Sequence, residues 1–125
     1  MDYELKFPSS TAAASVLQKI GIDPDTRDMD CQDFEYTSCE MNELSSYYEL
    51  YHQLTTTALE KRVLGCYLLQ SLNDHLDAQG VDHPLQKDAI QLLYKDKIIH
   101  RSELDYWAEN DWKIATFLNS IHWKT

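Results

Sequence analysis

The sequence TALEKRVLGCYLLQSLNDHLDAQG, residues 57–80, predicts one long helix around which the rest of the chain is arranged. Thr57 and Glu60 have the spacing of a capping box, in which each side chain satisfies a backbone N–H of the first turn. Apolar residues then fill several adjacent helical rows, a wider stripe than a helix buried on one side needs. Gly65 costs about 1 kcal/mol relative to alanine here and is interpreted as a point of close approach by another helix. Gly80 supplies the left-handed residue that ends the helix.

Length and composition favour one compact domain over residues 1–125. The chain has 125 residues and 43% hydrophobic content, which suffices for a core without disulfides or a structural metal. No apolar run of about 18 residues and no basic-then-apolar leader is present, so neither a membrane span nor a secretory signal is predicted and a cytoplasmic location is expected. Cys31, Cys39 and Cys66 are interpreted as reduced thiols because their number is odd.

Four shorter helices are predicted around the central one from apolar residues three and four positions apart. Their expected starts are a cap at Ser9 or Ser10, a second capping box formed by Thr37 and Glu40, Pro84 behind an Asp82 or His83 cap, and a cap at Ser102. The alternation of Tyr3, Leu5 and Phe7 with charged residues indicates a short extended arm. The fold class predicted is therefore all-α, a single-domain bundle of about five helices around residues 57–80.

The apolar rows of the outer helices define an expected core. The second helix is expected to bury one stripe, made of Met41, Leu44, Tyr48, Tyr51 and Leu54. Ile98 and Ile99 are expected to enter the core, and the last helix to bury Leu104, Trp107, Ile114, Leu118 and Ile121. Asp111 interrupts this last row. It is either a functional acid in a cleft beside Trp107 and Trp112, or a buried carboxylate paired with a basic side chain.

Negative charge is concentrated in one part of the chain. The net charge is −10, and residues 23–49 contain nine acids against the single base Arg27, a local net charge of −8. Because Asp23-Pro24 favours a turn, residues 22–38 are predicted to form an acidic loop. Such charge disfavours nucleic acid and membrane surfaces and favours a basic protein partner.

This acidic region provides the candidate partner-binding residues. Acids steer a basic partner, while tyrosines bury a large area at small rotamer cost. The candidates are Asp28, Asp30, Asp33, Glu35, Tyr36, Glu40, Glu43 and Tyr47. The alternative is an ordinary solvated loop followed by a solvated helix face.

No catalytic, metal or cofactor motif is evident in the sequence. The cysteines and histidines have no paired ligand spacing, and His75, Asp77 and His83 are interpreted as solvated groups at a helix end. The three glycines are isolated, so no phosphate-binding loop is predicted, and no nucleophile elbow is present. We therefore expect no metal, no cofactor and no enzymatic activity.

In size and charge the chain resembles the small acidic immunity proteins with which bacteria neutralise toxins. This resemblance implies a stoichiometric inhibitor that covers the basic surface of a cognate toxin, such as a nuclease, without chemistry of its own. Two alternatives come from other classes: a DNA mimic or regulatory adaptor, and a small enzyme built around Asp111. Neither the partner nor the oligomeric state follows from the sequence.

Overall fold

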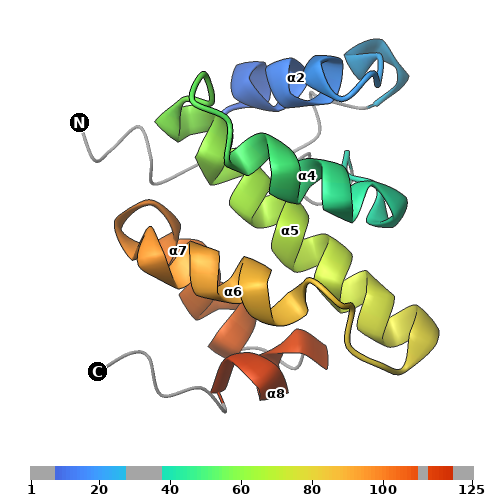
Figure 1. Cartoon of the computed structure of the whole chain (residues 1–125), viewed down its shortest axis with the longest axis vertical. Coiled ribbons are helices and arrows are strands. Elements are labelled where there is room, and N and C mark those ends of the chain that lie inside the picture. The colour runs from blue at the N-terminus through green and yellow to red at the C-terminus, as the bar shows by residue number, and fades with distance from the viewer. Residues whose placement is uncertain (1–7, 28–37, 110–112, 120–125) are drawn as a thin grey trace.

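The structure is a computed structural model that describes residues 8–27, 38–109 and 113–119, and all regular structure in these ranges is helical (Figure 1). The α-helices are α2 (Ser10–Lys19), α4 (Leu44–Tyr51), α5 (Ala58–Gln79), α6 (Gln86–Lys95), α7 (Lys97–Glu109) and α8 (Lys113–Asn119). Two 3₁₀ turns, η1 (Pro24–Thr26) and η2 (Met41–Glu43), lie between α2 and α4. The predicted all-α class is confirmed. The expected N-terminal arm lies outside the described residues.

The helix α5 is the centre of the fold, as predicted, and contacts each of the other five α-helices. Thr57 and Glu60 form the capping box with both hydrogen bonds present, and Gly80 ends the helix at a φ of 71°. Every residue in the range 62–69 is buried, because helices pack on α5 from several sides. None of the described helices combines the length and the apolar composition that a bilayer crossing requires.

Gly65 admits the imidazole ring of His100 from α7. A Cβ atom built on Gly65 lies only 2.4 Å from Nδ1 and 2.7 Å from Cε1 of that ring. The predicted close approach is therefore confirmed, although the approaching group is a side chain of the neighbouring helix and not its backbone. His100 is fully buried as a result.

The predicted first helix is also confirmed. The Ser9 hydroxyl oxygen accepts a backbone N–H of the first turn of α2, and Gly21 follows the helix at a φ of 86°. Two polar contacts join α2 to the first turn of α5: the Ser15 hydroxyl donates to Glu60 over 2.7 Å, and the Lys19 ammonium lies 2.8 Å from the same carboxylate. This carboxylate therefore caps α5 and holds α2 against it.

The second helix begins later than predicted. Thr37, the first member of the predicted capping box, lies outside the described residues; a 3₁₀ turn precedes the α-helix, and the carboxylate of Glu40 binds Arg27. The buried face of α4 consists of Leu44, Tyr47, Leu50 and Tyr51. Tyr48 is only partly buried, and Leu54 is fully exposed because α4 ends at residue 51.

The C-terminal helices differ from prediction at three points. The fourth helix begins at Gln86 and not at Pro84, because the backbone N–H of Leu85 is donated to the His83 ring in a preceding turn. The predicted last helix is two helices, and α7 starts five residues before Ser102. The core position expected for Ile98 is wrong, since it is 86% exposed. On a helix already formed at this point, it lies about 200° around the axis from buried His100.

Buried polar contacts fix α7 and α8 on α5. Arg62 of α5 and Glu103 of α7 form an ion pair of 3.3 Å in which both side chains are almost completely buried. The indole N–H of Trp107 donates to the same carboxylate over 2.9 Å. The backbone N–H of Ile114 in α8 donates to the side-chain oxygen of Asn73 over 3.0 Å. The sequence did not indicate these pairs, because their members are 41 residues apart or are common helix residues.

Candidate protein-docking sites

The turn η1 presents Arg27 toward the start of η2. Asp23 opens this turn, and its side-chain oxygen accepts the backbone N–H of Asp25 over 3.0 Å. The Thr26 hydroxyl donates to the Asp23 carbonyl over 2.6 Å and accepts from the Arg27 guanidinium over 3.1 Å. The turn predicted at Asp23-Pro24 is therefore present and orients the one base of the acidic region.

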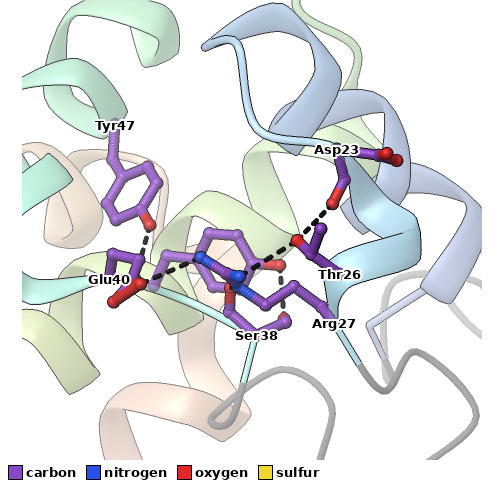
Figure 2. Close-up of polar contacts among 7 residues, drawn as sticks. Asp23, Thr26, Arg27, Ser38, Glu40 and Tyr47 are labelled. Atoms are coloured by element: carbon purple, nitrogen blue, oxygen red, sulfur yellow. Dashed lines mark hydrogen bonds and ion pairs between the residues drawn. The ribbon is translucent and has the colours of Figure 1, made fainter.

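Arg27 connects the two described segments that flank positions 28–37. Its Nε donates to the backbone carbonyl of Ser38 over 3.3 Å, and its Nη2 lies 2.9 Å from a carboxylate oxygen of Glu40 (Figure 2). The chain thus leaves this network at Arg27 and returns to it at Ser38. The two ends of the interval are held to each other by a side chain of one and the backbone of the other.

Two buried tyrosines anchor this network to the helical body. The Ser38 hydroxyl is 2.6 Å from the hydroxyl of Tyr67 on α5, and the backbone N–H of Glu40 donates to the hydroxyl of Tyr47 on α4 over 2.8 Å (Figure 2). The two rings pack with centroids 5.1 Å apart. Burial raises the pKa of both phenols well above the ordinary value, so they act as neutral hydrogen-bonding groups.

The predicted partner-binding residues have different positions in the structure. Tyr47, which we expected as an anchor for a partner, is fully buried, so the structure removes it from the docking surface. It lies on the buried face of α4 together with Leu44, Leu50 and Tyr51. Glu40 is half-exposed and already paired with Arg27, while Glu43 is partly buried and accepts the Ser46 hydroxyl over 3.0 Å. The remaining candidates, Asp28, Asp30, Asp33, Glu35 and Tyr36, lie outside the described residues.

Two grooves bordered by α6 were not predicted from the sequence. The larger, of about 550 Å³, lies between the end of α4 and α6, with Tyr48 and His52 on the α4 side and Asp88 on the α6 side. The smaller, of about 240 Å³, lies at the start of α7, and we call it the α7 groove. It is lined by Tyr94, Lys97, Ile98, Arg101, Leu104 and Asp105. The sequence signal for this groove is the close spacing of Lys97 and Arg101 around Ile98, a residue whose apolar character favours a core position.

The histidines and cysteines of the described ranges make local contacts and form no metal-binding cluster there. No three His, Cys, Asp or Glu side chains in residues 8–27, 38–109 and 113–119 are grouped so as to hold a metal ion. The rings of His75 and His83 meet edge to face, 4.9 Å between centroids, and Nδ1 of His83 accepts the N–H of Leu85. Burial raises the pKa of Cys39 to about 12, so its thiol stays protonated.

A buried polar chain links α4 to α7. The hydroxyl of Tyr51 lies 2.7 Å from the carboxylate of Asp96 and 2.6 Å from Nε2 of His100. Burial lowers the pKa of His100 to about 3, so the ring is neutral and acts as a structural group. Neither groove is lined by this chain of contacts. Asp111, the acid considered for an enzymatic role, lies outside the described residues.

No protein-family model, curated protein or solved structure matches this chain.

Proposed function

We propose that this protein is a stoichiometric protein-binding inhibitor, and specifically a cytoplasmic immunity protein that neutralises a cognate bacterial toxin. The observation that carries the proposal is the charge distribution: residues 23–49 hold a net −8 of the total −10. The contacts of Arg27 and Ser38 support the proposal further. They hold the two residues that flank positions 28–37 to each other and to α5.

The inhibitor acts by occupying a basic surface. Toxins that cleave nucleic acid have cationic active sites because they bind phosphates, and a carboxylate-rich segment meets the same cations. Long-range attraction accelerates the encounter and weakens with salt, because the Debye length is about 8 Å at physiological ionic strength. No step of this mechanism breaks or forms a covalent bond.

Arg27 restricts which acids carry the docking charge. It neutralises Glu40, so the proposal assigns the steering role to Asp28, Asp30, Asp33 and Glu35, with Tyr36 as the aromatic anchor. A segment whose ends are already fixed loses less conformational freedom on binding than one attached at flexible ends. The contacts that Arg27 and Ser38 make at the two ends of this segment therefore favour a tight complex.

The first experiment tests the activity itself. The genes beside this one are searched for a secreted protein with a toxin domain, that domain is co-expressed with this protein, and growth is measured against an empty vector. We expect full rescue of growth and a 1:1 complex in light scattering. Growth arrest that the protein does not relieve would contradict the proposal.

The second experiment tests the surface. Asp28, Asp30 and Asp33 are changed to Lys, and the control variant changes three exposed acids elsewhere, Asp77, Asp82 and Glu109, to Lys. Both variants change the net charge of the protein by the same amount, so the effect of total charge on long-range attraction to the partner is matched. We expect the association rate at low salt to fall at least about 10-fold for the first variant and less than about 3-fold for the control. Equal rates for the two variants would remove positions 28–33 from the interface.

A further inference from the structure

Unpaired cations gather at the start of α7 in a protein that is otherwise acidic. The ion pairs of the described ranges use Lys19, Arg27 and Arg62. In contrast, Lys97 and Arg101 form no ion pair with any carboxylate of those ranges, and both are exposed. Their positive charge is therefore available to an external anion.

An exposed apolar side chain lies between these two cations. Ile98 is 86% exposed, and with Tyr94 and Leu104 it makes the apolar part of the α7 groove. Positions 97, 101 and 104 recur three and four residues apart, so the groove follows one side of α7. Its volume of about 240 Å³ lies below the range of about 300 to 1,000 Å³ that is usual for small-molecule sites. It suits a single large side chain of a protein.

We propose that the α7 groove binds a short acidic segment of a partner protein. An apolar side chain of the segment packs on Ile98 and Tyr94, while flanking carboxylates pair with Lys97 and Arg101. Lys95, which borders the neighbouring groove together with Tyr94, receives a further carboxylate if the segment continues past Tyr94.

The total charge of the protein selects a short segment over a large anionic surface. DNA or an anionic membrane would meet the field of the whole molecule, whose net charge is −10. A short peptide within one Debye length, about 8 Å, experiences mainly the local cations. Asp105 also lines the groove and limits the number of carboxylates it accepts.

This surface is separate from the acidic region that the proposed function uses. The α7 groove is lined by residues between 94 and 105, whereas the contacts around Arg27 and Ser38 come from residues 23–47 and Tyr67, so the two share no residue. The two surfaces also differ in sign of charge. The inference therefore does not depend on the immunity role.

The test uses the full-length protein, labelled with ¹⁵N, and a defined probe. The probe is an octapeptide with three glutamates on either side of a leucine-phenylalanine pair. One control peptide has two serines in place of this pair, and another has glutamines in place of the glutamates. We expect amide shifts in residues 94–105 with the probe and at least about fivefold weaker binding of both control peptides.

Protein variants locate the site. K97Q/R101Q and I98S are each expected to weaken probe binding at least about fivefold. The matched variant K87Q/K113Q removes the same charge from exposed positions outside the groove and is expected to change affinity less than about twofold. All five substituted positions lie in helices, and an unchanged circular dichroism spectrum and melting temperature verify that each variant keeps its fold.

Several outcomes overturn the proposal. Shifts confined to other residues, or equal losses in the two double variants, would exclude the groove. Tighter binding, dependent on Lys97 and Arg101, to phosphatidylserine vesicles or to a DNA duplex would make the occupant a membrane or nucleic acid. Self-association that K97Q/R101Q abolishes would make it a second copy of the chain. Failure of growth rescue in the toxin experiment leaves these outcomes unaffected.

Discussion

At position 65, the absence of a side chain is what allows α7 to pack. In an ordinary helix interior, Gly to Ala is stabilising by about 1 kcal/mol. Here the new methyl group would meet the His100 ring at 2.4 Å, and the ring is enclosed on all sides. We therefore expect Gly65→Ala to destabilise the protein by about 1 to 3 kcal/mol, the usual cost of overpacking, measured by urea unfolding.

A double-mutant cycle provides the control for this prediction. In a His100→Ala background the space beside Gly65 is free, so the same Gly65→Ala change should be neutral or stabilising. The two changes should therefore couple by about 1 kcal/mol or more. Additive effects, or a stabilising Gly65→Ala in the wild-type background, would show that the ring does not occupy this space.

The role of a single residue was predictable from the sequence where that residue acts on its near neighbours in the chain. The caps at Ser9, Thr57 and Gly80 depend on neighbours within four residues, and all three are present. The burial of Tyr47 was not predictable, because Tyr47 and Tyr48 both lie close to the row of Leu44 and Tyr51, and only packing against the rest of the molecule decides which of the two is buried.

Between elements, the buried pair Arg62 and Glu103 holds α5 against α7. Removing one partner leaves the other charge buried and uncompensated, which costs about 3 to 5 kcal/mol. We expect Glu103→Gln to destabilise the protein by about this amount, less what the amide retains through its bond to Trp107. Urea unfolding at constant pH measures the loss.

Replacing both partners by apolar residues distinguishes charge from packing. The double variant Arg62→Met/Glu103→Leu leaves no buried charge, so it should be more stable than Glu103→Gln alone. Such a result matches the general behaviour of buried ion pairs. A double variant as unstable as the sum of two single replacements would mean that the contact acts through packing geometry and not through charge.

Element existence was easier to predict than element ends. Apolar spacing identified helices over most of α2, α4, α5, α6 and α7. The boundary between α6 and α7 was not predicted, because the apolar residues near it, Ile98 and Ile99, read equally well as core. The α7 groove exists because this helix starts early and leaves Ile98 outside. The sequence pattern alone therefore does not indicate this groove.

Stability of the whole molecule should depend on pH in two separate ranges. Burial lowers the pKa of His100 from 6.5 to about 3. For Glu60, burial opposes ionisation, but Lys19, the Thr57 backbone N–H and Ser15 outweigh it and lower the pKa from 4.5 to about 2. Both groups bind protons less readily in the folded state. The stability from neutral His100 is complete above pH 6.5 and is lost as the pH falls toward 3, while that from ionised Glu60 is complete above pH 4.5 and is lost toward 2.

Urea unfolding between pH 8 and 3 tests these ranges. We expect the free energy of unfolding to begin falling below pH 6.5 and to fall more steeply below 4.5. In His100→Gln the loss between pH 6.5 and 4.5 should shrink to the part contributed by His83, whose pKa burial also lowers. In Glu60→Gln only the lower range should flatten. A wild-type curve that is level from pH 7 to 5 would show that His100 is accessible to protons when folded.

The central position of α5 also has a consequence for synthesis on the ribosome. The helices α2 and α4 emerge first, yet each buries its apolar face chiefly against α5, which is made afterwards. Until residue 79 has left the exit tunnel, the nascent chain has no surface on which to complete its core. Chaperones that shield exposed apolar segments are thus expected to engage this polypeptide until residue 79 has emerged, and to release it once α5 is available.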